Sequence, residues 1–153
     1  MQQHVYHAPP AKNEPVLSYK KGSQERQKLI EAINSARNEV VDIPMLIDGT
    51  EIFTDKKISI HPPHDINHLL GYYNRGTSEH VEMAIDAALR SKEKWSGMRW
   101  EQRASIFLKA AGMISGPYRA RIDAATMLGQ SKSVHQAEID AACELADFLR
   151  FNV

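Results

Sequence analysis

The sequence contains a single cysteine, Cys143, in 153 residues. One thiol cannot form an internal disulfide framework or a zinc site held by several cysteines, and such scarcity fits a reducing compartment. No apolar run approaches the roughly 20 residues that span a bilayer, so we expect no membrane segment. Lys and Arg total 19, as do Asp and Glu, so no net basic field favours binding to nucleic acid. These absences predict a soluble globular chain and single out no class of partner.

The N-terminal region also lacks a targeting pattern. Residues 1–22 are polar and interrupted by Pro9, Pro10, Pro15 and Gly22, which predicts an extended arm. They show neither a basic segment followed by an apolar one nor the Arg-rich amphipathic character of an organelle presequence. We therefore expect a cytoplasmic protein, with the mitochondrial matrix as the alternative.

A helix is expected from Ser23, a residue that caps helices well, to the region just before Pro44. Apolar residues recur between them at helical spacing: Leu29, Ile33, Ala36 and Val40. Asp48-Gly49 then separates two short β-type segments and favours a two-residue hairpin turn. With two more short apolar runs further on, the sequence predicts a small sheet in residues 44–73.

The second half of the sequence predicts only helices. Thr77 or Ser78 can cap the first, a second begins near Glu101 with its large apolar residues facing inward, and Ser133 caps the last. Between these, a helix that follows Pro117 is expected to end at a glycine. The inward residues of the second helix are expected to be Ile106, Phe107, Ala110, Met113 and Ile114, and Trp95 and Trp100 are expected to be core anchors.

The last helix places four residues on an apolar arc, namely Ala137, Ala141, Leu145 and Phe148. This face needs more neighbours than so short a chain can supply. We therefore expect Val153 to be an interruption and not a natural domain end. The alternative is a stand-alone, non-catalytic helical module that binds another protein through this face.

Several segments resemble aldehyde dehydrogenases, and most closely the pyrroline-5-carboxylate dehydrogenase branch of that family. They are NEPV, the GS-x-E-R helix opening, RASIFLKAA, SGPYRA, GQSK and QAEIDAACELADFLRFN. The resemblance implies an α/β fold with helices over a parallel sheet, of which this chain is the N-terminal portion and mostly helical. It also implies that residues 23–153 are the first, incomplete part of an NAD-binding domain.

The activity implied by the resemblance is NAD-dependent oxidation of L-glutamate γ-semialdehyde to L-glutamate in proline catabolism. In this family a cysteine thiolate attacks the aldehyde and a glutamate activates water. Those residues and the dinucleotide-binding loop come later in the family's sequence, so we expect no catalytic residue here and NAD bound mainly by residues beyond this chain. The resemblance further implies a homo-oligomeric full-length enzyme. A dehydrogenase for another semialdehyde is the nearest rival within the enzyme class.

Glu144 is the candidate substrate-binding residue. It lies between the apolar arc and an acidic edge formed by Asp140 and Asp147, and it has no basic partner at i+3 or i+4, whereas Asp147 has Arg150. By resemblance, Glu144 matches a family position beside the aldehyde, where a carboxylate can pair with the α-ammonium group of glutamate semialdehyde. The alternative is an ordinary solvated helix acid.

Other chemically suggestive residues have simpler interpretations. Acidic neighbours along the helix disfavour a thiolate at Cys143, so a packed side chain is expected. The spacing of His61, His64 and His68 resembles that of metal ligands, but the loop around them offers no fixed tetrahedral set, and we expect no metal. Residues 129–132 lack the first glycine of a phosphate loop. Four arginines interleaved with acids are expected to be surface charges or salt-bridge partners: Arg99, Arg103, Arg119 and Arg121.

Overall fold

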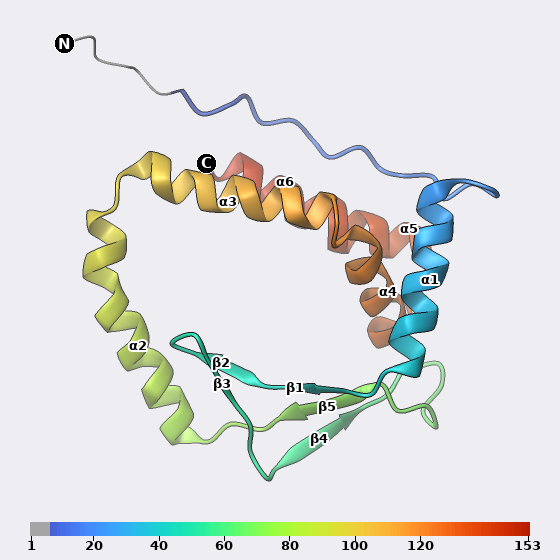
Figure 1. Ribbon diagram of the computed structural model, residues 1–153, viewed down its shortest axis with the longest axis horizontal. Coiled ribbons are helices and arrows are strands. Elements are labelled where there is room, and N and C mark those ends of the chain that lie inside the picture. Colours follow the sequence, from blue (N-terminus) through green and yellow to red (C-terminus); the bar gives the residue numbers. More distant parts are fainter. Residues whose placement is uncertain (1–6) are drawn as a thin grey trace.

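The computed structural model describes residues 7–153, so the first six residues of the expected arm lie outside the described part. In chain order the elements are α1 (Gln24–Asn38), β1 (Val41–Ile43), β2 (Met45–Ile47), β3 (Thr50–Ile52), β4 (Lys57–Ile60), β5 (Gly71–Asn74), α2 (Ser78–Gly97), α3 (Trp100–Ser115), α4 (Arg119–Gln130), α5 (Val134–Ala137), the π-helical turn η1 (Glu138–Cys143) and α6 (Glu144–Phe151). Figure 1 shows the arm passing over the helical side, the small strands at the opposite side, and α2 joining the two.

Three helices begin at the residues that the sequence predicts. The Ser23 hydroxyl accepts a hydrogen bond from the Arg26 amide at 3.4 Å, and Thr77 is the residue before α2. Ser133 and Gln136 form a reciprocal capping box at the start of α5, in which the Gln136 side chain accepts from the Ser133 amide at 2.9 Å. Capping depends on residues within one turn, which is why it is visible in the sequence.

The expected extension of the first helix to Val40 was wrong. Helix α1 ends at Asn38, and Val41–Ile43 instead forms strand β1, which pairs in parallel with β5. The β1 amides and carbonyls thus bond to a segment about thirty residues further along the chain. A distant partner of this kind overrides the local helical spacing of apolar residues.

The predicted hairpin is confirmed, because β2 and β3 pair antiparallel around Asp48 and Gly49. These two residues have φ angles of 53° and 75°, which both central positions of such a turn require. The other three strands form a separate sheet in the order β1-β5-β4, with β4 and β5 antiparallel.

Asn74, at the end of β5, connects the strands through its buried side chain. Its amide nitrogen donates to the Asp42 carboxylate at 2.8 Å and to the Ile43 carbonyl at 2.9 Å, while its oxygen accepts from the Thr54 amide at 2.7 Å. Because a buried amide is costly unless it is hydrogen-bonded, these bonds hold β1 beside β5.

The helices pack in two pairs, α1 against α4 and α3 against α6. The core of the first pair contains Tyr19 from the arm, Leu29 from α1 and Ala124 from α4. The arm therefore contributes a core residue and is not simply a solvated extension. The end of α4 differs from the prediction, since the helix continues past Gly129 to Gln130, and Ser131 takes the left-handed conformation at φ 56°.

Large apolar side chains remain exposed on several helices. Val81, Ile85 and Leu89 lie four residues apart on α2 and are 59%, 53% and 62% exposed. The expected inward packing of the α3 face was wrong for three of its five residues, and neither tryptophan is a core anchor within this chain: the exposed residues are Ile106, Phe107, Met113, Trp95 and Trp100. Helix α3 buries its small residues Ala104 and Ala111 and leaves these larger ones uncovered.

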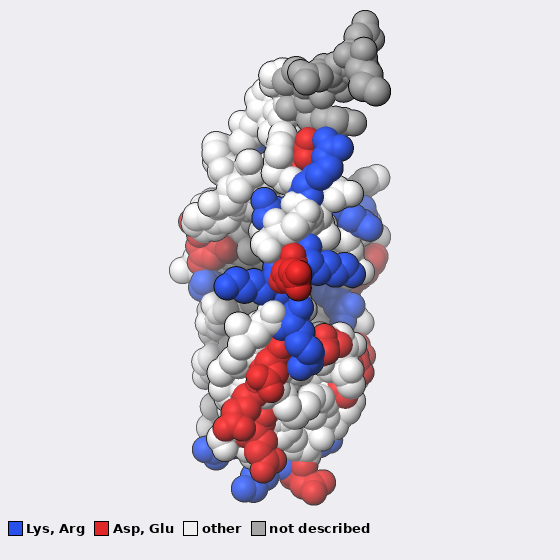
Figure 2. Space-filling view, turned by 90° about the vertical axis from the view of Figure 1, so that its left-hand side faces the viewer, with Lys and Arg blue, Asp and Glu red and all other residues white. Residues whose placement is uncertain are grey.

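Charges of both signs share the face that α2 presents. Figure 2 shows acidic side chains gathered over the first half of the helix and basic ones nearer its end. This order complements the helix dipole, which favours negative charge at the N-terminus and positive charge at the C-terminus. Within residues 7–153, no helix is long and apolar enough to cross a membrane.

We predict that Gly71→Ala weakens the pairing of β1 with β5. An added Cβ would lie 2.2 Å from the Val41 carbonyl oxygen and 2.6 Å from its Cγ2, so the strands must separate. The expected loss is about 1–3 kcal/mol of unfolding free energy, as for other overpacked sites. Thermal or denaturant unfolding measures it. Gly97→Ala, where nothing lies within 4 Å of the added Cβ, is the control, and equal stabilities for the two variants would contradict the prediction.

Candidate functional site

The structure contains a buried ion pair between Arg119 at the start of α4 and Glu138 at the start of η1. The Glu138 side chain is fully buried, and the guanidinium contacts its carboxylate through Nη2 and through Nε, the latter at 3.1 Å. The arm completes the cluster, since the Leu17 amide donates to Glu138 at 2.6 Å and the Pro15 carbonyl accepts from Arg119 at 2.8 Å. Of the two roles expected for Arg119, surface charge or salt-bridge partner, the structure shows the second. The salt bridge is buried.

Glu14 extends this cluster to α6. One of its oxygens lies 2.6 Å from Arg119 Nη1 and the other 2.7 Å from Arg150 Nη1. Asp147 accepts from the Asn13 side chain at 2.9 Å and from the Glu14 amide at 2.7 Å. The arm is thereby held against α4, η1 and α6 by hydrogen bonds to charged groups, which are stronger than neutral ones.

Tyr19 lies between two buried carboxylates, with its hydroxyl oxygen 2.7 Å from both Asp123 and Glu138. A phenol has one proton and cannot donate to both. Burial alone would raise the pKa of Glu138, but hydrogen bonds from Arg119 and from the arm hold it below the usual range. Burial raises the pKa of Asp123 to about 6, and the charge of Glu138 adds to this effect. Below that pH the extra proton resides on Asp123, which can donate it to Tyr19.

The predicted substrate residue, Glu144, directly follows the π-turn η1. The Glu144 amide donates to the Ile139 carbonyl, five residues earlier, where an α-helix would use the carbonyl four residues earlier. The wider turn brings Glu138 and Cys143 to the same face, with the thiol 3.6 Å from the Glu138 carboxylate and 3.4 Å from Arg119 Nη2. Nothing in the sequence pattern indicated this turn.

Glu144 itself is exposed, and its side chain makes no hydrogen bond or ion pair with any residue in 7–153. The two acids of the neighbouring edge do have partners. Asp140 binds Lys132 at 2.6 Å, and Asp147 binds Arg150 at 3.5 Å, as the i,i+3 spacing predicted. Glu144 is thus the acid of this helix that is left available to a group from outside the described chain.

The apolar side chains beside Glu144 are also uncovered. Leu145, Phe148 and Phe151 are 42%, 64% and 56% exposed. The prediction that this chain cannot fully cover the apolar residues of its last helix is confirmed, although α6 packs against α3. The predicted apolar arc was wrong about which residues are buried. The π-turn buries Ala142, Cys143 and Ala146 in place of Leu145 and Phe148.

Cys143 is buried as expected for a packed side chain. Burial first, and then the charge of Glu138, raises the pKa of its thiol to about 11, so it is not a thiolate near neutral pH. The cause differs from the expectation, which invoked the acids along the helix surface. A thiol with a raised pKa is a poor nucleophile.

The histidines do not converge. His61 Nδ1 lies 2.9 Å from the His68 carbonyl oxygen, and His64 Nδ1 lies 2.7 Å from the Ser131 hydroxyl. Within residues 7–153 no group of three or more His, Cys, Asp or Glu is arranged to hold a metal ion.

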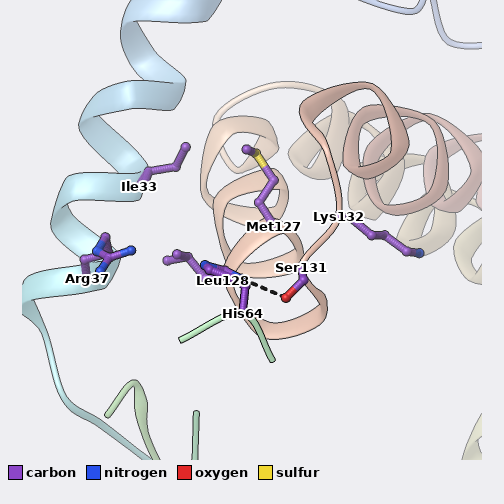
Figure 3. A pocket seen from close by; sticks show the side chains of 7 residues that line it. All are labelled: Ile33, Arg37, His64, Met127, Leu128, Ser131 and Lys132. Atoms are coloured by element: carbon purple, nitrogen blue, oxygen red, sulfur yellow. Dashed lines mark hydrogen bonds between the residues drawn. The ribbon is translucent and has the colours of Figure 1, made fainter. Parts of the chain in front are cut away.

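A cavity of about 340 Å³ adjoins His64 and is lined by Ile33, Arg37, His64, Met127, Leu128, Ser131 and Lys132. Figure 3 shows Arg37 directed toward it and Lys132 extending away from Arg37. Both cations already have acidic partners, since Arg37 binds Asp65 at 3.2 Å and Lys132 binds Asp140. The geometry therefore does not assemble an anion site, in keeping with the absence of a phosphate-loop pattern.

The residues described here do not fit a dinucleotide. The sequence has no G-x-G-x-x-G segment, and Gly129 lies in the last turn of helix α4, whereas a pyrophosphate cradle lies between a strand and a helix. We derive no catalytic step through NAD from this chain.

The aldehyde dehydrogenase family model matches residues 52–153, and the chain belongs to that family. Its relatives within the family carry the name of one particular enzyme. The chain is 46% identical over 150 residues to delta-1-pyrroline-5-carboxylate dehydrogenase of Agaricus bisporus, covering 97% of this chain and 28% of the relative. It is 42% identical over 140 residues to the human mitochondrial enzyme of that name, covering 92% and 25%.

The chain is also similar to solved structures of enzymes with this name. The delta-pyrroline-5-carboxylate dehydrogenase of Mycobacterium tuberculosis superimposes with a TM-score of 0.94 at 42% identity, covering 97% of this chain and 28% of that one. The same enzyme bound with NAD and cobalamin gives 0.95 at 40% identity, covering 99% and 29%. The resemblance and the α/β fold class predicted from the sequence are confirmed. The chain spans little more than a quarter of the length of these relatives.

We predict that Asp123→Asn changes the pH dependence of stability. Folding raises the pKa of Asp123 from its ordinary value near 4 to about 6, so stability is lost as pH rises through that window. Asparagine stays neutral and can donate to Tyr19. The variant should therefore be more stable than the parent at pH 8, by roughly 1–3 kcal/mol, and lose this advantage at pH 4.5.

Unfolding measured at both pH values tests this prediction. Asp86→Asn, at an exposed site on α2, is the control. The same stability difference between Asp123→Asn and the parent at both pH values would count against a proton on Asp123.

Proposed function

We propose that this chain is the N-terminal part of an NAD-dependent dehydrogenase that oxidises L-glutamate γ-semialdehyde to L-glutamate. The observation that carries the proposal is the 46% identity over 97% of the chain to an enzyme named for pyrroline-5-carboxylate. Residues 1–22 then form an arm, and residues 23–153 form the first part of the cofactor domain. NAD is bound mainly by the remaining sequence, an assignment supported by the NAD-bound M. tuberculosis structures.

Glu144 is the residue of this chain that we assign to substrate. Its carboxylate is exposed, lacks a partner among residues 7–153, and lies beside exposed apolar side chains. An α-ammonium group would pair with it through a charge-assisted hydrogen bond that a plain aliphatic aldehyde cannot form.

In the complete enzyme, Glu144→Gln should raise KM for glutamate semialdehyde much more than KM for an aliphatic aldehyde of similar length. The ratio of the two kcat/KM values should fall about 10- to 100-fold, the range for a lost charge-assisted bond. Steady-state kinetics with both substrates measures it. Asp140→Asn, which breaks an exposed ion pair on the same helix, is the control. Equal losses on the two aldehydes would remove Glu144 from substrate recognition.

The isolated chain should be inactive. We expect purified residues 1–153 to show no NAD-dependent oxidation of glutamate semialdehyde, because no residue here matches the family's nucleophile, base or dinucleotide loop. Absorbance of NADH reports turnover, with the complete enzyme as positive control. Any turnover by the isolated chain that survives repurification would contradict the proposal.

The alternative is a stand-alone interaction module, favoured by the exposed Leu145, Phe148 and Phe151. Mass spectrometry of the native product separates the two, since the enzyme requires a product several times longer than 153 residues. Gel filtration of that product tests the proposed homo-oligomer. Fractionation tests the cytoplasm against the mitochondrial matrix, since the Dictyostelium discoideum and mouse relatives are named as mitochondrial enzymes.

A further inference from the structure

We propose that Glu138 and Arg119 are positioning residues for Glu144, because their buried pair selects the π-helical register of the last helix over an α-helical one. This inference rests on the proposed role of Glu144 in substrate recognition. It concerns which residue of the helix is presented to the substrate, and not a new contact with the substrate.

The same segment has two available registers. In a continuous α-helix, Ala137, Ala141, Leu145 and Phe148 share one face, and this register would bury two large apolar side chains. In the observed register the buried residues after Ala137 are Glu138, Ala142, Cys143 and Ala146, while Leu145 and Phe148 are 42% and 64% exposed. Within the described chain, apolar burial therefore favours the register that is not adopted.

Polar contacts at both ends of η1 stabilise the observed register. Arg119 Nη2 contacts Glu138, the first residue of the turn, and lies 3.4 Å from the thiol of Cys143, the last. In an α-helix these two positions would point about 140° apart and could not share one guanidinium. Only the wider π-turn lets Arg119 hold both.

The arm secures the helix beyond the turn. Glu14 bonds Arg119 through one oxygen and Arg150 through the other, and its amide donates to Asp147. A slip of one residue would rotate α6 by about 100° and break the bonds of Glu14 to Arg150 and Asp147 together. It would also replace Glu144 by a neighbouring residue at the position facing the substrate.

Cys143 provides a readout of the register that does not depend on activity. Cys143 is 5% exposed in the observed register, and in the α-helical register its thiol turns away from Arg119 toward solvent. Alkylation of Cys143, followed by peptide mass spectrometry of the complete enzyme, therefore distinguishes the two registers. A general loss of stability would not by itself separate the two aldehyde substrates in a kinetic assay.

The experiment compares Glu138→Gln, Glu14→Gln, Asp140→Asn and Glu144→Gln in the complete enzyme. Glu138→Gln removes the charge facing Arg119, and Glu14→Gln is a milder change at the edge of the cluster. Both should increase Cys143 alkylation and lower the preference for glutamate semialdehyde over an aliphatic aldehyde, about tenfold for Glu138→Gln. Asp140→Asn, in the same turn but paired outward with Lys132, should change neither.

Unchanged alkylation and preference in both Glu138→Gln and Glu14→Gln would overturn the proposal. Equal loss of activity on the two aldehydes in Glu138→Gln, with Glu14→Gln unchanged, would overturn it as well, since that pattern is simple destabilisation. Failure of the proposed function is a separate result. In that case Glu144→Gln leaves the preference unchanged, while Cys143 alkylation still reports whether the pair sets the register.

Discussion

The buried pair of Arg119 and Glu138 joins three parts of the chain that are far apart in sequence. Burying both charges costs solvation free energy, and a pair of this kind is tolerated only when further hydrogen bonds satisfy it. Here the arm supplies them through Glu14, the Pro15 carbonyl and the Leu17 amide. Removing one partner would leave the other as an uncompensated buried charge. The arm, α4 and η1 are consequently one structural unit.

Local sequence features predicted much of the secondary structure. Ser23 and Ser133 mark helix starts because a side-chain oxygen caps an amide within the same turn. Asp48-Gly49 marks the hairpin because both residues accept positive φ angles. The family resemblance and the uncovered face of the last helix could also be seen in the sequence. For the candidate site, the isolation of Glu144 followed from the absence of a base at i+3 or i+4.

The features that sequence reasoning missed depend on distant partners. Strand β1 exists because of β5, although its residues continue a helical pattern. Arg119 resembles the surface arginines around it until the arm folds over it. The π-turn is the clearest case, since the apolar spacing of Ala137, Ala141, Leu145 and Phe148 is that of an ordinary α-helix. A buried charge can outweigh apolar spacing in setting the register of a helix. Its effect depends on partners far away in the sequence, so residues within one helical turn do not reveal it.

In one part of the molecule the buried polar groups have hydrogen-bond partners, while in another part large apolar side chains remain exposed. Both oxygens of the Glu138 carboxylate have hydrogen-bond partners within the chain, whereas the apolar stripes of α2 and α6 are open. An unpaired buried polar group costs more than an equal area of exposed hydrocarbon, so the polar cluster must be completed locally. An apolar face can be covered later by any surface of matching shape, because the hydrophobic effect does not require a particular orientation of the contacting groups. In the proposed role of Glu144, this difference lets the buried polar cluster set the orientation of the helix while the apolar residues beside Glu144 stay open to other protein.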